Sequence, residues 1–243
     1  MHPILLEWGP FTFYSYGLMI GLGFLLALSF SGRRAKRAGL DPAAVQGVVV
    51  LALLLGLLGA RAAYVALNWE LYRDNPLEVI RFDHGGLVFY GGLAAGVAGA
   101  LWALRRYRLP MGRTLDLLTP PLVLAHAIGR VGCFLNGCCY GKPTTLPWGV
   151  IFRGEDLPRH PTQLYESAAL LLLLGILLRM EARSSLRSGA VFISYLLLYG
   201  LWRFCVEFLR GDNPFVALGL TPFQWISLPF IGISFLLILR RSG

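Results

Sequence analysis

Charged residues are scarce in this sequence. Asp, Glu, Lys and Arg make up only 14% of its 243 residues, whereas a soluble domain carries about 25%. So few charges could not cover a surface that faces water, and the apolar residues, 56% of the chain, fall in long runs. The pattern excludes an ordinary soluble globular protein and predicts that most of the surface faces lipid.

Acidic residues are the scarcer of the charged residues, with 13 Asp and Glu against 22 Lys and Arg and a net charge of +9. In a soluble protein such an excess would suggest nucleic acid as a partner. Here the basic residues stand in short clusters between apolar runs, which indicates membrane topology, so we predict no nucleic-acid partner. The N-terminus also lacks a basic region and a small-residue cleavage site, so we do not expect a removable signal peptide.

The apolar runs predict about seven membrane-spanning helices, each near the length that a bilayer needs. The fourth run contains Pro120 and Pro121. We therefore expect an interrupted span that faces protein or a water-filled cavity rather than lipid. The predicted spans are 12–31, 43–67, 86–104, 114–137, 162–178, 190–209 and 222–239.

The basic residues predict the orientation, because they gather in every second connection while the other connections hold most of the acids. The positive-inside rule then places the N-terminus outside and the C-terminus in the cytoplasm. We predict an all-α integral membrane protein with a single membrane domain over 1–243 and an outer-side loop region at about 138–161. The basic clusters are Arg33, Arg34, Lys36 and Arg37; Arg105, Arg106, Arg108 and Arg113; Arg179, Arg183 and Arg187; and Arg240 and Arg241.

Three arginines, Arg61, Arg130 and Arg203, lie inside predicted spans. An arginine near the middle of a membrane costs about 2.5–3.5 kcal/mol on insertion scales. Internal pairing is one interpretation, since Glu207 is four residues from Arg203 on one helix face and Glu166 can serve another arginine. The alternative counts three arginines against two buried acids, which leaves one guanidinium free to bind an anion such as a lipid phosphate.

A distinctive motif stands in the fourth predicted span and just after it: Gly-Arg-Val-Gly-Cys-Phe-Leu-Asn-Gly-Cys-Cys-Tyr-Gly at 129–141. With this motif the chain resembles the prolipoprotein diacylglyceryl transferases. Supporting motifs follow the family's order: Tyr-Gly-Leu-Met at 16–19, Gly-Ala-Arg-Ala-Ala-Tyr at 59–64, Gly-Gly-Leu-Val-Phe-Tyr-Gly-Gly at 85–92, Arg-His-Pro-Thr-Gln-Leu-Tyr-Glu at 159–166 and Tyr-Gly-Leu-Trp-Arg-Phe-Cys-Val-Glu-Phe-Leu-Arg at 199–210.

The resemblance implies an enzyme of the bacterial inner membrane that needs no metal or cofactor. Such an enzyme transfers the diacylglyceryl group of phosphatidylglycerol to the lipobox cysteine thiol of a prolipoprotein signal peptide and releases glycerol phosphate. A central cavity open to membrane lipid would admit the two acyl chains. A transporter for anions, and a paralogue that binds anionic lipid with altered or no chemistry, stay as alternatives.

The same resemblance implies the roles of individual residues. Arg130 and Arg203 would clamp the phosphate, with Glu207 orienting Arg203. The other residues implied to contact phosphatidylglycerol or to line the site are Tyr16, Arg61, Gly129, Gly132, Asn136 and Tyr199.

The chain departs from the family pattern at the residue expected to act as the base. Tyr90 stands where the family usually has a histidine, and Cys133 and Cys138 stand where it commonly has Asn and Glu. A neutral phenol is a poor base, with a pKa of about 10. The candidates for the proton acceptor are therefore His126, His160, and Tyr90 as a phenolate. Alternatively, His126 is a hydrogen-bonded bridge between helices and Tyr90 is a packing residue.

Cys133, Cys138 and Cys139 lie close together in the sequence, and Cys205 lies in the sixth predicted span. Their spacing matches no common zinc pattern. Simple packing, a disulfide between Cys133 and Cys138 on the oxidising outer side, and a nucleophilic relay remain open interpretations.

Overall fold

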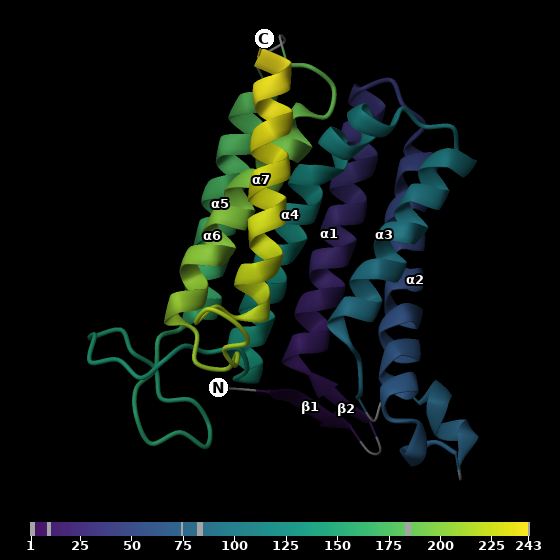
Figure 1. Cartoon of the computed structure of the whole chain (residues 1–243). Coiled ribbons are helices and arrows are strands. Elements are labelled where there is room, and N and C mark those ends of the chain that lie inside the picture. The colour runs from purple at the N-terminus through teal and green to yellow at the C-terminus, as the bar shows by residue number, and fades with distance from the viewer. Residues whose placement is uncertain (1–2, 9–10, 74, 82–84, 183–185, 243) are drawn as a thin grey trace. The chain divides into compact units, whose positions relative to one another are not determined.

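The computed structural model describes residues 3–8, 11–73, 75–81, 85–182 and 186–242, and these residues form seven α-helices and one two-stranded hairpin (Figure 1). Each predicted span coincides with one helix apart from a few residues at its ends. The helices are α1 (Ser15–Arg37), α2 (Pro42–Leu67), α3 (Phe89–Arg106), α4 (Met111–Asn136), α5 (Thr162–Glu181), α6 (Ala190–Val206) and α7 (Pro222–Ser242).

Six of the helices among the described residues are long and apolar enough to cross a membrane. This confirms the predicted integral membrane protein. The remaining helix, α3, has 18 residues, many of them Gly and Ala, and ends on Arg105 and Arg106. Its crossing of the membrane, and with it the seventh span, stays a prediction.

The chain divides into two compact units. The first comprises Met1–Ser29 and Leu115–Gly243, so it holds the start of α1, nearly all of α4, and α5, α6 and α7. The second is Phe30–Thr114 and holds α2 and α3. The expectation of a single membrane domain over 1–243 stays a prediction.

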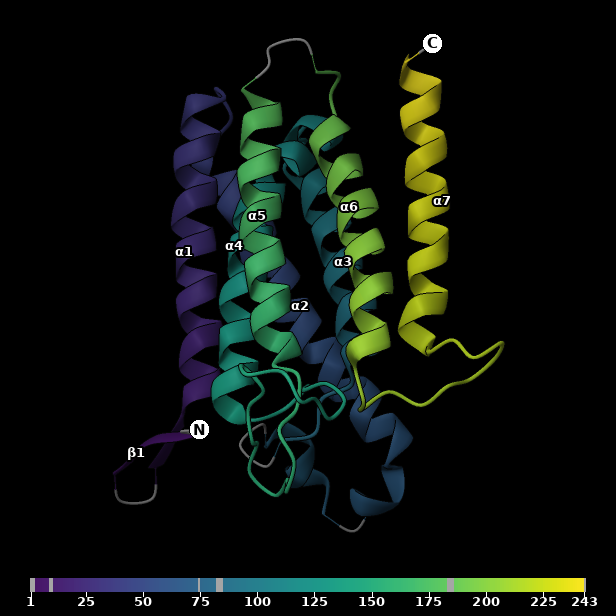
Figure 2. The ribbon, with the colours of Figure 1, turned by 90° about the vertical axis from the view of Figure 1, so that its left-hand side faces the viewer.

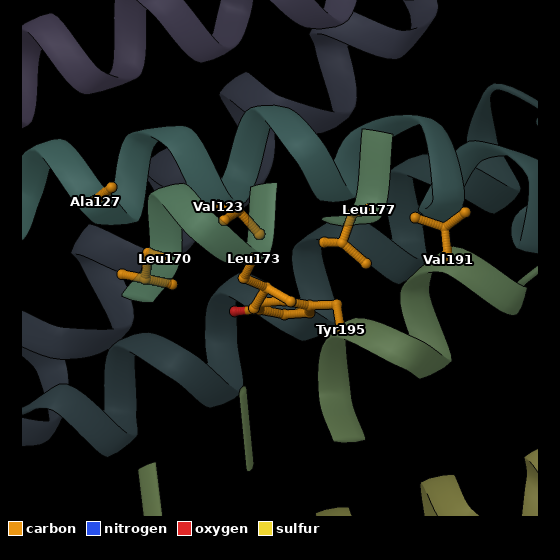
Figure 3. Packing of buried hydrophobic residues seen from close by; sticks show 7 residues of the cluster. All are labelled: Val123, Ala127, Leu170, Leu173, Leu177, Val191 and Tyr195. Carbon is orange, nitrogen blue, oxygen red and sulfur yellow. The ribbon is translucent and has the colours of Figure 1, made fainter. Parts of the chain in front are cut away.

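The core of the first unit lies where α4, α5 and α6 meet. Figure 3 shows side chains from the three helices pointing toward one another, with Tyr195 of α6 closing the cluster. A further link between α4 and α5 is polar, since the Ser167 hydroxyl donates to the Ala127 carbonyl at 3.0 Å. The buried members of the core are Val123, Ala127, Leu170, Leu173, Leu177, Val191 and Tyr195.

Helix α4 is continuous, which corrects the expected interruption at its prolines. Pro120 and Pro121 lie inside the helix, and the Thr119 hydroxyl just before them donates to the Leu115 carbonyl at 2.7 Å. Half of its most apolar window is buried, the largest share among the candidate spans, and the expectation that it faces protein or a water-filled cavity rather than lipid stays a prediction. Asp116 caps α6 by accepting from the N–H groups of Gly189 at 2.6 Å and Phe192 at 2.9 Å.

An antiparallel hairpin precedes α1 in the first unit and was not predicted. Strand β1 (Ile4–Trp8) pairs with β2 (Phe11–Tyr14), with Glu7 opposite Thr12 and a register shift between Ile4 and Leu6. Figure 2 shows that the hairpin and the connection from α4 to α5 lie at one end of this unit, while the C-terminal end of α7 lies at the other.

The second unit is built on a close contact between α2 and α3. A Cβ atom placed on Gly59 would stand 2.2 Å from the Ala95 Cβ, and one on Gly91 would stand 2.6 Å from the Gly59 carbonyl oxygen. Small residues on facing helices permit this approach, as in many membrane helix pairs. Beside the contact lies an apolar groove of about 480 Å³, lined by residues that include Leu55, Leu58 and Trp102.

Candidate functional site

Glu166 of α5 is the centre of a buried polar cluster in the first unit. Its Oε1 atom lies 2.9 Å from Nη2 of Arg130, accepts a hydrogen bond from the Tyr199 hydroxyl at 2.9 Å, and lies 3.8 Å from Nε2 of His126. The Glu166 residue itself is fully buried. We call Glu166, Arg130, His126 and Tyr199 the polar cluster.

The helices account for this arrangement. His126 and Arg130 are four residues apart on α4, so both project from the same face of the helix. Tyr199 comes from α6, where its ring stacks on Tyr195 at 5.6 Å and meets the His126 ring edge-on at 5.2 Å. The three helices that form the apolar core thus also bring the four polar groups together.

The polar cluster is only partly satisfied. Nε of Arg130 and Oε2 of Glu166 are buried and have no hydrogen-bond partner among the described residues. Buried polar groups are normally paired, and those that are not need an explanation such as a bound ligand or a catalytic role. One guanidinium N–H of the cluster therefore has no acceptor among the described residues.

Arg203 and Glu207 form a second buried pair one turn further along the chain from Tyr199. Nη1 of Arg203 lies 2.6 Å from Oε2 of Glu207, which confirms the pairing predicted from their spacing. Glu207 begins the 3₁₀ turn η4 (Glu207–Leu209), and its Oε1 accepts from Asn213 at 2.6 Å and Thr221 at 2.8 Å. The Arg203 guanidinium lies 4.5 Å from the centre of the Phe223 ring.

The remaining residues predicted in this unit lie where α1 meets α4. A Cβ on Gly132 would stand 2.9 Å from the Met19 Cβ and 3.4 Å from the Tyr16 ring, while one on Gly129 would approach Ile20. Asn136 is the last residue of α4. These glycines permit close packing of the two helices, and the predicted contact of Tyr16, Gly129, Gly132 and Asn136 with lipid stays a prediction.

Arg61, in the second unit, is surrounded by backbone carbonyls. Its Nε donates to Val79 at 2.9 Å, Nη2 donates to Glu78 at 2.6 Å and Arg81 at 2.9 Å, and Nη1 donates to Gly85 and Gly86. These carbonyl dipoles stabilise a positive charge for which the sequence offers no carboxylate. Arg61 therefore fixes the segment around the 3₁₀ turn η2 (Pro76–Ile80), and its contact with lipid stays a prediction.

Tyr90 is the second residue of α3 and is partly exposed at 44%. Its ring meets the Phe89 ring edge-on at 5.6 Å. The adjacent Gly91 faces Gly59 and Ala63 of α2. The glycines that follow Tyr90 thus serve the packing of α2 on α3, and the role of Tyr90 in catalysis stays a prediction.

The end of α4 and the connection that follows it hold three of the four cysteines. All four cysteines are free, and three of them, Cys133, Cys138 and Cys139, lie together. Hydrogen bonds from the Cys133 and Cys138 thiols, and then the Arg210 guanidinium, lower the pKa of the Cys139 thiol against the opposing effect of burial.

The other histidine considered as a base lies in the same connection. Nδ1 of His160 is 3.3 Å from the Tyr165 hydroxyl, which also accepts from the Trp148 indole at 2.7 Å. His160 thus belongs to a separate hydrogen-bonded group from the polar cluster.

The sequence alone does not identify two of the central residues. It assigns Glu166 only the role of a counter-ion, whereas three groups share one oxygen of that carboxylate. It also leaves Arg210 among the surface charges, although the side chain is 5% exposed and pairs with Asp212 at 2.5 Å. Glu166 could have been recognised as central because an acid inside a membrane span is rare. Arg210 could not, because a nearby Asp in the sequence does not show that the arginine is buried.

Comparisons with known proteins agree over almost the whole chain. The family model described as prolipoprotein diacylglyceryl transferase matches residues 3–240. A phosphatidylglycerol–prolipoprotein diacylglyceryl transferase of Clostridium tetani is 36% identical over 233 residues, covering 94% of this chain and 93% of the relative. Similar proteins of the same name from Synechococcus elongatus and Cupriavidus pinatubonensis are 35% and 34% identical, covering 87% and 99% of this chain and 78% and 94% of the relatives.

Proposed function

We infer the activity of this protein from its family, because the chain belongs to the prolipoprotein diacylglyceryl transferase family, whose model matches residues 3–240. It is an enzyme, a phosphatidylglycerol–prolipoprotein diacylglyceryl transferase. The observation that carries this conclusion is the similarity, over nearly the full length of both chains, to relatives that bear that name. Its substrates are then phosphatidylglycerol and a prolipoprotein.

The proposed reaction joins the sulfur of the lipobox cysteine to the glycerol carbon that carries the phosphate ester. The bond from that carbon to the phosphate oxygen breaks, and glycerol phosphate leaves with the bonding electrons. The thiol proton passes to a base or to water. Negative charge thus builds on the phosphate, where fixed cations lower the barrier.

Arg130 and Arg203 are the cations that we assign to the phosphate. Both are largely buried, and Arg130 keeps a guanidinium N–H without a partner among the described residues. Glu166 and Glu207 hold the two guanidinium groups, while Tyr199 positions Glu166 through its hydroxyl. A guanidinium fork fits phosphate oxygens bidentately, which supports this assignment.

His126 and Tyr90 are the two candidates for accepting the thiol proton. His126 belongs to the polar cluster, 3.8 Å from Glu166, which supports a role close to the phosphate. Tyr90 occupies the motif position where the family usually has a histidine. Transfer rates of Tyr90→Phe and His126→Ala separate them, because only loss of the base should reduce the rate of thiol attack.

We further propose that the protein lies in the bacterial inner membrane with seven spans, its N-terminus outside and its C-terminus in the cytoplasm. A central cavity open to lipid would admit the acyl chains. Two observations support this orientation: the N-terminal hairpin and the C-terminal end of α7 lie at opposite ends of the first unit, and basic residues cluster after α5 and at the end of α7.

The test is growth of a cell that lacks its own transferase, together with transfer of labelled lipid from phosphatidylglycerol to a lipobox peptide by the purified protein. The wild-type protein should restore growth. Arg130→Lys and Arg203→Lys should lower the transfer rate by about 10²–10³, as removal of one electrostatic donor does in other enzymes. Arg73→Lys, at an exposed pair with Glu70, is the matched control and should retain the rate.

A second candidate function follows from Tyr90 at the histidine position: a paralogue that binds anionic lipid without transfer. That candidate gains support if the wild-type protein fails in both assays while it still binds phosphatidylglycerol vesicles. Full transfer by both lysine variants would instead refute the phosphate role of the arginines and leave the activity itself intact.

A further inference from the structure

Three thiols meet at the end of α4, and the proposed transfer reaction uses none of them. The Sγ atoms of Cys133, Cys138 and Cys139 all lie within 4.8 Å of one another. Cys133 is buried and the other two are partly buried. Cys205, on α6, is exposed and does not belong to the group.

The way α4 ends explains why the first two thiols meet. The N–H of Gly137 donates to the Phe134 carbonyl and the N–H of Cys138 donates to the Cys133 carbonyl, both at 3.1 Å, while Gly137 has a φ of +76°. This pair of bonds is the Schellman motif, which brings the side chains of the first and sixth residues into contact. At many helix ends that contact is hydrophobic; here both residues are cysteines.

The third thiol is brought in by an unusual backbone conformation. Cys139 has a φ of +64°, which costs a residue with a Cβ roughly 1–2 kcal/mol. Two side chains of α5 hold the segment: Thr162 donates to the Cys139 carbonyl at 2.8 Å and Gln163 donates to the Cys138 carbonyl at 2.6 Å. Such strain persists only where surrounding contacts impose it, and it clusters at functional sites.

Two guanidinium groups lie near the three thiols. The Arg210 side chain, 5% exposed, is close enough to Cys139 to lower the pKa of its thiol, and Arg130 lies one helical turn before Cys133. Arg210 is itself held by Asp212 through two bonds at 2.5 and 2.9 Å. Fixed guanidinium groups at this point compensate the negative charge that a set of thiolates would carry.

The number and kind of ligands restrict what could bind. The group contains three thiols and no histidine or carboxylate among the described residues. Hard ions such as Mg²⁺ and Ca²⁺ require oxygen ligands, and structural Zn²⁺ takes four ligands. Soft thiolate ligands select ions such as Cu(I). With a metal–sulfur bond of about 2.3 Å, three sulfurs around a central ion stand about 4.0 Å apart, and the three thiols here all lie within 4.8 Å of one another.

We propose that Cys133, Cys138 and Cys139 form a three-thiolate binding site for a soft, thiophilic ion of the Cu(I) class. The ion would tie the end of α4 to the segment that follows it, next to the turn that carries Arg130. Its role is therefore structural and is separate from the transfer chemistry.

The first test is a Cu(I) titration of the reduced full-length protein in detergent, without oxygen, in competition with the chromogenic chelator bicinchoninate. We expect one bound equivalent in the wild-type protein and in Cys205→Ser, the matched control. Cys133→Ser, Cys138→Ser and Cys139→Ser should each weaken binding by at least about tenfold, since even changes around metal ligands cost 10–100-fold. Wild-type affinity in the variant with all three replaced would overturn the site.

The second test requires no variant, so it also decides the case if a serine variant fails to fold. The wild-type protein is treated with N-ethylmaleimide and analysed by mass spectrometry. Cys138, Cys139 and Cys205 should be alkylated without metal, and only Cys205 after one equivalent of Cu(I). Equal alkylation in both samples would refute the site, and tighter binding of Zn²⁺ than of Cu(I) would refute the class of ion.

Discussion

The three arginines inside the predicted spans have two kinds of partner: Arg130 and Arg203 pair with glutamates, and Arg61 donates to backbone carbonyls. The pairing of Arg203 with Glu207 is predictable from their spacing, and an acid in the fifth span predicts a partner for a second arginine, which proves to be Arg130. The carbonyls around Arg61 are not predictable, because every residue has a backbone carbonyl and the sequence does not show which ones converge. The guanidinium in excess of the two buried carboxylates is therefore Arg61, and backbone carbonyls stabilise its charge.

Replacement of Glu166 by Gln should strongly affect the polar cluster. It leaves Arg130 without its counter-ion, and breaking a buried ion pair typically costs about 3–5 kcal/mol. We expect a clearly lower melting temperature in detergent and loss of transfer activity. Glu70→Gln is the control, since its pair with Arg73 is exposed, and it should change neither quantity noticeably. Equal effects of the two substitutions would show that Glu166 has no special role.

Arg61→Lys should destabilise the second unit although it preserves the charge. An ammonium has three N–H groups, whereas the guanidinium donates to five carbonyls, so at least two carbonyls lose their partner. An unsatisfied buried group costs about 1–3 kcal/mol. Thermal unfolding measures the loss, with Arg73→Lys as the exposed counterpart. An unchanged melting temperature would mean that the carbonyls are satisfied in another way.

At the scale of elements, the helices are the best predicted part of the chain. Long apolar runs mark them, and only their ends differ from the prediction. The proline pair in α4 shows where this reasoning fails: the two prolines remove two backbone donors, yet the helix continues through them in the most buried of the candidate spans, where the surrounding helices support it.

Two glycine-to-alanine substitutions should have opposite effects on stability, because Gly59 lies in the contact between α2 and α3 whereas Gly175 of α5 has open space beside it. In Gly59→Ala the new methyl group would collide with Ala95, and overpacking costs typically about 1–3 kcal/mol. Gly175 of α5 has no atom within 4 Å of its added Cβ, so Gly175→Ala should gain about 0.5–1 kcal/mol from its helix preference. Thermal unfolding of the two variants checks the sign, and a stabilised Gly59→Ala would contradict the close contact.

For the whole molecule, the sequence predicts an all-helical integral membrane protein, and the six long apolar helices confirm this class. The N-terminal hairpin escapes prediction because its residues, such as Leu5, Leu6, Phe13 and Tyr14, are as apolar as those of a span. The division into two units cannot be predicted from the amino-acid composition, since both units consist of similar apolar helices.

The orientation can be tested with single cysteines introduced into a variant in which all four native cysteines are serine. Glu70→Cys and Glu155→Cys should react with a membrane-impermeant maleimide from outside the cell, because both follow helices predicted to end there. Arg106→Cys and Arg187→Cys should react only after lysis. Reaction of Arg106→Cys from outside would show that α3 does not cross the membrane.

The carbonyls around Arg61 bear on which substitutions the segment from 78 to 86 can accept over evolutionary time. Val79 and Arg81 serve the guanidinium through main-chain oxygens, which any amino acid supplies. Gly85 and Gly86 are restricted by φ values of +73° and +80°, and Gly86 also by the Tyr64 ring. Homologues should therefore keep Arg61, Gly85 and Gly86, whereas positions 79 and 81 should tolerate other amino acids.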